Sequence, residues 1–244
     1  MRIKLEKLGK RYGGQHVLDA VDLELGPQEI VAVIGLNGAG KTTLLRCLAG
    51  IIAPTAGKIL IDDALFTRGD LAQRKRELFL PDFPVFVPGH SVLEHLAMIL
   101  RLYGRETEVD GAQVAATLAD FDLLPLAGTP LATLSRGQAY KAALAGLVLA
   151  RPELWLLDEP FASGMDPQGL AAFKTRARAA AEAGATILYT TQILEIAERF
   201  STQLVVIDRG RLKRTFSRAE LAAMPSSGRG SLEDRLVEFR ERPG

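Results

Sequence analysis

The sequence has little cysteine and almost no net charge. Cys47 is the single cysteine among 244 residues, so a disulfide framework is excluded, and we expect this side chain to fill core space in a reducing compartment. Thirty basic residues nearly balance 29 acidic ones, which leaves a formal net charge of +1. A nucleic-acid-binding domain usually carries a clear basic excess. We therefore expect no nucleic-acid partner.

Long apolar segments are also missing. The longest, residues 142–150, covers nine positions and ends before Arg151 and Pro152. A membrane span needs roughly 20 apolar residues. The first residues alternate as in a strand and do not resemble a secretion signal. Any role at a membrane is therefore expected to depend on a partner protein.

The sequence does contain a glycine-rich turn between an apolar run and a helix-like segment. Residues 35–43 read Gly-Leu-Asn-Gly-Ala-Gly-Lys-Thr-Thr, the phosphate-loop pattern, and the apolar residues 30–34 precede them. Glycines let backbone N–H groups approach phosphate oxygens, and the helix N-terminus adds about half a positive charge. We expect Lys41 to reach the β- and γ-phosphates and the Thr42 hydroxyl to bind Mg²⁺. The residues predicted to bind a nucleoside triphosphate are Gly35, Asn37, Gly38, Ala39, Gly40, Lys41, Thr42 and Thr43.

The hydropathy pattern predicts an α/β fold that is interrupted by helices. Strand-like segments lie at residues 2–8, 21–25, 30–34, 58–61, 77–80, 154–157, 186–190 and 204–207. Helix-like segments lie at residues 92–103, 110–120, 136–150, 167–183 and 193–200, and a hairpin turn lies at 209–210. We predict a P-loop NTPase core with N-terminal antiparallel β-strands and an inserted helical subdomain.

We expect these parts to form a single domain. Residues 1–82 and 151–224 would make the core with its β subdomain, and residues 83–150 the helical subdomain. Residues 225–244 would be a linker followed by a C-terminal helix, because Ser231 and Asp234 form a capping-box pattern before a short amphipathic segment.

Two carboxylates follow the apolar residues 154–157. The end of a strand beside a phosphate loop is where an acidic group can hold Mg²⁺, which predicts this role for Asp158. Glu159, one position on, points elsewhere and is placed to polarise the attacking water as general base. In the absence of a phosphate loop, two solvated acids capping the next turn would be the simpler interpretation.

A third motif, Leu-Ser-Arg-Gly-Gln at residues 134–138, begins the alanine-rich helix. Ser135 and Gln138 have the spacing of a capping box, in which Gly137 would be incidental. A helix N-terminus with serine and glycine is also a typical anion site. Both interpretations are compatible with the sequence.

Together these motifs resemble the nucleotide-binding subunit of ATP-binding cassette (ABC) transporters, over nearly the whole chain and in the order of that family. Residues 134–138 resemble the Leu-Ser-Gly-Gly-Gln signature, with Arg136 in place of the first glycine. Residues 163–166 resemble the loop that crosses the dimer interface. Tyr12 stands where the family places an aromatic side chain against adenine.

The resemblance implies that ATP and Mg²⁺ bind between two cassettes that meet head to tail, either two copies of this chain or one copy and a paralogue. The phosphate loop of one cassette would then face Ser135, Gly137 and Gln138 of the other. Closure would move an integral membrane permease, and hydrolysis would release the pair. The expected location is the cytoplasm, at the inner face of the cell membrane, where the permease holds the chain.

Two positions differ from the family pattern. Asp82 follows the strand at 77–80 where the family usually has glutamine, and Gln192 follows the strand at 186–190 where it usually has histidine. Gln192 can donate a hydrogen bond to phosphate but cannot carry a proton or a charge. Asp82 could bind the metal, or it could repel the γ-phosphate. Because Lys41 and Glu159 remain, we predict a slow but real ATPase with Gln192 in the catalytic site and Asp82 near the metal.

The segment at residues 81–88 is unusually apolar for a loop. Its side chains could fold back into the core, or they could form a groove for a helix of the permease. Two other functions stay open: a regulatory cassette that dimerises on ATP but barely hydrolyses it, and a soluble ABC ATPase outside transport. Neutral charge and a single cassette argue against a role on nucleic acid or ribosomes.

Overall fold

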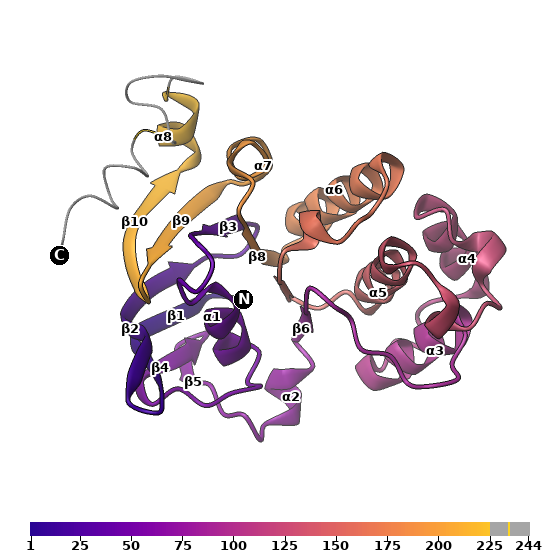
Figure 1. Cartoon of the computed structure of the whole chain (residues 1–244). Coiled ribbons are helices and arrows are strands. Elements are labelled where there is room, and N and C mark those ends of the chain that lie inside the picture. The colour runs from indigo at the N-terminus through magenta and orange to yellow at the C-terminus, as the bar shows by residue number, and fades with distance from the viewer. Residues whose placement is uncertain (225–233, 235–244) are drawn as a thin grey trace.

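The computed structural model describes residues 1–224 and residue 234 and contains two β-sheets (Figure 1). The first sheet has the strand order β2-β1-β4-β5, with every neighbouring pair antiparallel. Its strands are β1 (Ile3–Tyr12), β2 (Gln15–Leu25), β4 (Ala56–Ile61) and β5 (Ala64–Leu65). The antiparallel N-terminal strands are confirmed. β1 and β2 are longer than predicted because they form one hairpin, whose turn at Gly13 and Gly14 has positive φ angles.

The second sheet has the order β10-β9-β3-β8-β7-β6, parallel from β9 to β6 with β10 antiparallel at its edge. Its strands are β3 (Ile30–Ile34), β6 (Glu77–Leu80), β7 (Leu154–Leu157), β8 (Thr186–Thr191), β9 (Gln203–Asp208) and β10 (Arg211–Ser217). All residues of β3, β7 and β8 are buried, as expected for parallel strands covered on both faces. The mixed α/β fold predicted from the sequence is confirmed.

Alternate residues of β3 point into two separate cores. Ile30, Ala32 and Ile34 face the larger core, which also contains side chains of α5, α6 and α7. Val31 and Val33 face a second core shared with α1 and the first sheet, and Cys47 lies there. Burial raises the pKa of the Cys47 thiol to about 11, so this side chain acts as inert packing, as expected.

Five α-helices of the described residues lie outside the segment between β6 and β7. They are α1 (Lys41–Leu48), α2 (Leu71–Arg74), α6 (Pro167–Glu182), α7 (Leu194–Phe200) and α8 (Arg218–Ala222). The sequence analysis missed α2 and α8, because each is a helix of about one turn that packs few apolar residues. Helix α6 begins after the Asp166 cap and is followed by Gly184 at a φ of 111°, as the pattern predicted.

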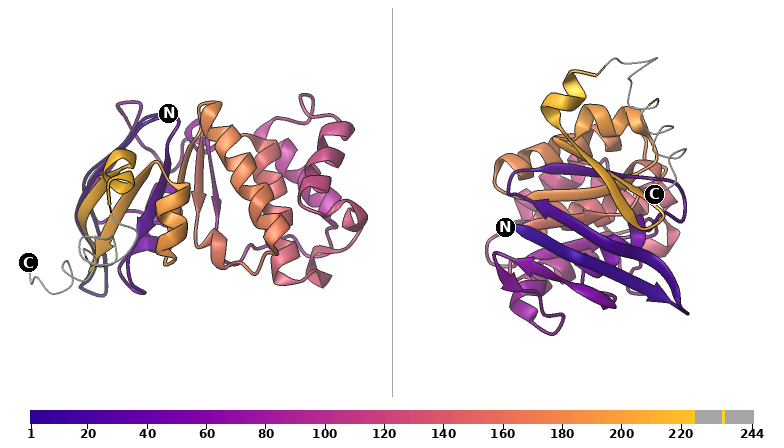
Figure 2. Two further views of the ribbon diagram at one scale, coloured as in Figure 1. Left: turned by 90° about the horizontal axis from the view of Figure 1, so that it is seen from above. Right: turned by 90° about the vertical axis from the view of Figure 1, so that its left-hand side faces the viewer.

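Three helices are inserted in the chain between β6 and β7. In space they lie far from β1 and β2 (Figures 1 and 2). They are α3 (Val92–Tyr103), α4 (Gly111–Asp120) and α5 (Arg136–Ala150), with 3-10 turns at Leu124–Leu126 and Leu131–Thr133. The capping box expected at Ser135 is formed, and Ser91 forms another at the start of α3. The division into subdomains stays a prediction. The predicted linker and C-terminal helix lie, apart from Asp234, outside the described residues.

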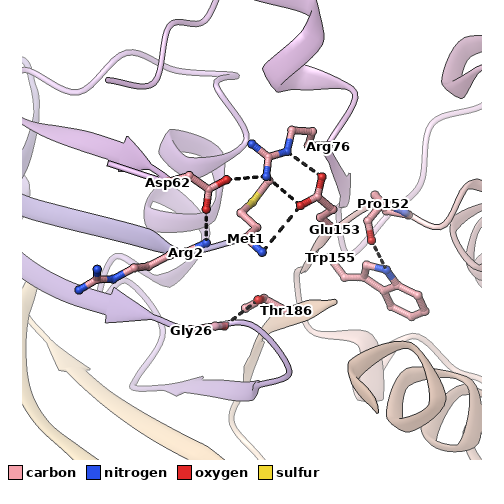
Figure 3. Close-up of polar contacts among 9 residues, drawn as sticks. All are labelled: Met1, Arg2, Gly26, Asp62, Arg76, Pro152, Glu153, Trp155 and Thr186. Carbon is pink, nitrogen blue, oxygen red and sulfur yellow. Dashed lines mark hydrogen bonds and ion pairs between the residues drawn. The ribbon is translucent and has the colours of Figure 1, made fainter. Parts of the chain in front are cut away.

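An ion-pair network joins the two sheets at the edge opposite the phosphate loop (Figure 3). Arg76 donates to Asp62 at 2.6 Å and to both carboxylate oxygens of Glu153 at 2.7 and 2.8 Å. Asp62 also accepts the backbone N–H of Arg2, at 2.8 Å. These contacts link the first sheet to the segments that precede β6 and β7.

Candidate nucleotide site

The carboxyl ends of four parallel strands meet at one edge of the second sheet. The phosphate loop follows β3, Asp82 follows β6, the Asp158–Glu159 pair follows β7, and Gln192 follows β8. Residues after neighbouring parallel strands converge at such an edge. A cavity of about 330 Å³ lies there and is lined by Leu36, Asn37, Gly38, Gly40, Lys41, Thr42, Thr43, Asp82, Asp158, Glu159 and Gln192. Leu36 and Gln192, which are 156 positions apart in the sequence, are thus brought together in one cavity.

Lys41 is nearly buried, and its ammonium group lies inside the phosphate loop. Its Nζ donates to the carbonyls of Gly35 and Leu36, at 2.8 and 3.2 Å, and lies 3.7 Å from Glu159 Oε1. Burial lowers the pKa of Lys41, while the carboxylates of Glu159 and Asp158 oppose that shift. Gly40 begins the helix at a φ of 106°, and a Cβ there would lie 2.6 Å from the Val17 carbonyl oxygen. Only glycine fits this turn.

Asp158 and Thr42 form a pair of oxygen groups beside the loop. Asp158 Oδ1 accepts from Thr42 Oγ1 at 3.1 Å and from Thr190 Oγ1 at 2.7 Å, so two hydroxyls fix its orientation. A carboxylate with a hydroxyl is the donor set that Mg²⁺ prefers, and this ion usually takes its remaining ligands from water and phosphates. Within the described residues no group of three or more histidine, cysteine, aspartate or glutamate side chains could hold a metal. A carboxylate and a hydroxyl leave most ligand positions of Mg²⁺ to water and phosphates, so this pair fits an ion that is bound together with a nucleotide.

Glu159 occupies a left-handed backbone conformation, with a φ of 49°, which non-glycine residues adopt rarely and which is frequent at functional sites. Its N–H donates to Thr190 Oγ1 at 2.9 Å, and its carboxylate accepts from Gln192 Nε2 at 3.4 Å. Burial raises the pKa of Glu159, and the carboxylates of Asp158 and Asp82 act in the same direction. Asp158 and Glu159, which are adjacent at the end of β7, thus both line the same cavity.

Asp82 lines the cavity but is bound from the outside by Arg136. The Arg136 guanidinium donates to Asp82 Oδ1 at 2.5 Å, and it also lies over the Phe83 ring, 4.0 Å from its centroid. The sequence analysis treated Asp82 and Arg136 as two separate departures from the family pattern. Their opposite charges were the signal that could have linked them.

The signature residues have a local role that the structure makes explicit. Ser135 and Gln138 form the predicted capping box, with contacts of 3.0 and 3.3 Å. The idea that Gly137 is incidental is wrong, because a Cβ there would lie 2.3 Å from the Gly164 carbonyl oxygen. Ser135, Gly137 and Gln138 do not line the cavity of their own chain.

Other predicted binding residues also lie outside the cavity lining. Tyr12 is half exposed, with Lys10 Nζ 5.0 Å from its ring centroid. Gly35 contributes its carbonyl to Lys41, and Ala39 is buried under the loop. Thr190 was not predicted, although it donates to the Asp158 carboxylate and accepts from the Glu159 backbone N–H; the threonines that end β8 were the available signal.

The fold and this cavity define a phosphate-loop nucleoside triphosphatase with an inserted helical region. The family model described as ABC transporter matches residues 18–162, more than half of the chain. The chain therefore belongs to the ATP-binding cassette transporter family, as one of its ATP-binding subunits.

Known relatives agree with this assignment. The chain is 29% identical over 237 residues to the ABC-type transporter ATP-binding protein EcsA of Bacillus subtilis, covering 97% of this chain and 96% of that protein. It is 35% identical over 226 residues to the nickel import ATP-binding protein NikO of Rhodobacter capsulatus, covering 87% of each. A solved ATP-binding subunit of an ABC transporter superimposes with a TM-score of 0.87 at 29% identity, over 99% of this chain and 100% of that one.

Proposed function

We propose that the chain hydrolyses ATP, with Mg²⁺, between two cassettes arranged head to tail and thereby drives transport through a separate membrane permease. The observation that carries this proposal is the convergence of Lys41, Thr42, Asp158 and Glu159 on one cavity. Each of these side chains has the chemistry that phosphoryl transfer to water needs: a cation, a metal-binding oxygen pair and a base.

The roles of these residues follow from their positions. Lys41 would exchange its contacts with the Gly35 and Leu36 carbonyls for the β- and γ-phosphates. Thr42 and Asp158 would hold Mg²⁺, which when bound neutralises charge on the phosphate oxygens. Glu159 would orient and deprotonate the attacking water, and its raised pKa suits a base that must accept a proton. Gln192 would donate to the γ-phosphate or to that water.

The second cassette would supply the signature residues, which do not line the cavity of their own chain. Ser135, Gly137 and Gln138 lie at the N-terminus of α5 but outside the cavity of their own chain. A helix N-terminus that is not used within the chain can bind the phosphate held by a second copy or a paralogue. Tyr12 is half exposed and free to stack on adenine.

Hydrolysis is expected to be slow, because Gln192 cannot carry charge or shuttle a proton. Asp82 is less of an obstacle than its charge suggests, since Arg136 compensates it. ATP binding is therefore retained, and the rate of the chemical step is lowered.

The permease would contact the loop between β6 and α3. Phe83, Val85 and Val87 are exposed there, by 62%, 90% and 42%, whereas Phe86 packs edge-on against His95. The two interpretations of this segment thus each apply to part of it. In the part of the chain that the structure describes, every helix is too short or too polar to cross a bilayer. We propose that this loop holds the chain at the cytoplasmic face of the membrane.

The test is ATP turnover by purified protein with and without Mg²⁺. Glu159→Gln should lower turnover at least about 100-fold, because a general base contributes about that much. Glu195→Gln, at an exposed position on α7, is the matched control and should leave turnover unchanged. Equal turnover by the wild type and Glu159→Gln would show that the assigned base is wrong. Co-purification with a membrane protein from detergent extracts, lost when Phe83 and Val85 are replaced by serine, tests the permease contact.

A further inference from the structure

Tyr140 is completely buried in the second turn of α5, but its hydroxyl has no hydrogen-bond partner among the described residues. Other tyrosines with little exposure have one: Tyr103 donates to the Glu77 carbonyl at 2.6 Å, and Tyr189 pairs with Ser201 at 2.7 Å. Leaving a buried hydroxyl unpaired is costly, so native proteins rarely do it. An unpaired hydroxyl next to a ligand site indicates a bond that forms in another state of the site.

Tyr140 belongs to the face of α5 that also carries Arg136, the residue that contacts Asp82. Arg136 and Tyr140 are four residues apart on α5, so they share one face of the helix, and helical side chains lean toward the N-terminus. Arg136 contacts Asp82 on that face. Burial raises the pKa of the Tyr140 phenol, and the carboxylates of Asp158, Asp82 and Glu159 raise it further. Each of these three acids lines the cavity.

Of these three carboxylates, Asp82 is the one that is free to move. Asp158 is fixed by two hydroxyls, and Glu159 lies between Lys41 and Gln192. Among the described residues, Asp82 is bound by Arg136 alone, from the solvent side, and its side chain is 36% exposed. A cation held by Thr42 and Asp158 would attract the Asp82 carboxylate into the cavity.

We propose that the Tyr140 hydroxyl donates a hydrogen bond to the Asp82 carboxylate when Mg–ATP fills the cavity. Arg136 and Tyr140 then hold Asp82 in two alternative positions, one beside Arg136 and one beside the Tyr140 hydroxyl. Tyr140 is a positioning residue that acts through Asp82. This inference rests on the Mg–ATP binding given under the proposed function.

The experiment measures Mg–ATP binding by titration calorimetry in the Glu159→Gln background, where hydrolysis is blocked. Tyr140→Phe should weaken Mg–ATP binding about tenfold, the usual effect of losing a hydrogen bond to a charged group. Binding of ATP without Mg²⁺ should not change. The melting temperature of nucleotide-free Tyr140→Phe should be unchanged or higher, because an unpaired hydroxyl is removed.

Two further variants identify the partner. In an Asp82→Ala background, which removes the acceptor, Tyr140→Phe should have no further effect on Mg–ATP binding. Arg136→Gln should weaken Mg–ATP binding less when Tyr140 is present than when it is replaced by phenylalanine, because the Tyr140 hydroxyl can then hold the freed Asp82 carboxylate. Tyr103→Phe is the matched control: it removes a hydroxyl that has a partner, so it should lower the melting temperature and leave binding unchanged.

The inference is overturned if Tyr140→Phe binds Mg–ATP as tightly as its parent, or if the loss is equally large with Asp82→Ala. If the parent Glu159→Gln protein itself fails to bind Mg–ATP, the proposed function fails instead. The two failures are therefore distinguishable.

Discussion

The Arg136 guanidinium donates to the Asp82 carboxylate across 2.5 Å, and so joins the first turn of α5 to the residue that follows β6. Both residues stand at positions where the family has an uncharged side chain, glycine in one case and glutamine in the other. Their charges cancel at the rim of the cavity. The contact also couples the helical region to the sheet, so movement of one against the other must break it or carry both residues along.

This ion pair predicts that replacing Arg136 or Asp82 alone weakens Mg–ATP binding more than replacing both. Arg136→Gly leaves the negative charge of Asp82 uncompensated beside the phosphates. The affinity for Mg–ATP should therefore depend more strongly on ionic strength than it does in the wild type. Asp82→Gln with Arg136→Gly restores the family pattern and should recover binding. The stability change itself should be small, about 0.2–1 kcal/mol, because both side chains are partly exposed. Strictly additive effects on nucleotide affinity in a double-mutant cycle would contradict this coupling.

Gln192→His should raise ATP turnover, because an imidazole can donate to phosphate and also carry a proton. Removal of a full donor typically costs about 10²–10³ in rate, and Gln192 already supplies a neutral one, so a gain of up to about tenfold is expected. Steady-state phosphate release measures it. Gln28→His, at an exposed site on the surface, is the control. An unchanged rate would show that Gln192 does not limit the reaction.

Gly137→Ala should destabilise the protein by about 1–3 kcal/mol, because its Cβ would lie 2.3 Å from the Gly164 carbonyl oxygen and the chain must shift. Gly146→Ala is a matched control on the same helix. Its Cβ would meet its nearest atom, Ile99 Cγ1, at 3.5 Å, which is ordinary contact, so this variant should be neutral or about 0.5–1 kcal/mol more stable. Urea unfolding measures both. Equal changes in the free energy of unfolding would mean that helix propensity alone determines the stability of the two variants, and that the contact with the Gly164 loop has no effect.

The buried side chain of Glu77 should make the stability of the protein depend on pH. Its side chain is 4% exposed, and burial raises its pKa from 4.5 to about 7, with Arg74 at 2.9 Å opposing the shift. The folded state therefore binds this proton more tightly than the unfolded state does. The stability from this group is present below pH 4.5 and is lost as the pH rises through 7.

Glu77→Gln should remove that loss. Its melting temperature relative to the wild type should rise between about pH 5 and about pH 8, corresponding to at most about 3 kcal/mol. Glu106→Gln, an exposed glutamate in the same region, should show no such trend. A parallel pH dependence in the wild type and Glu77→Gln would show that the glutamate is not protonated in the folded protein.

The sequence by itself determined the features that depend on residues close together in the chain. The phosphate loop, the capping boxes at Ser91 and Ser135 and the glycine end of α6 all use contacts within about four residues, which a linear pattern records. The convergence of Asp158, Gln192 and the loop was also predictable, because each follows a strand of one parallel sheet.

Only the tertiary structure decided how separate motifs touch. Asp82 and Arg136 are 54 positions apart, and the requirement for glycine at 137 comes from the Gly164 carbonyl in another loop. Such contacts depend on strand order and on where α5 lies against the sheet, and sequence spacing does not record either of these. For the same reason no sequence pattern indicates a role for Tyr140, whose hydroxyl the fold leaves buried and unpaired on the face of α5 that carries Arg136.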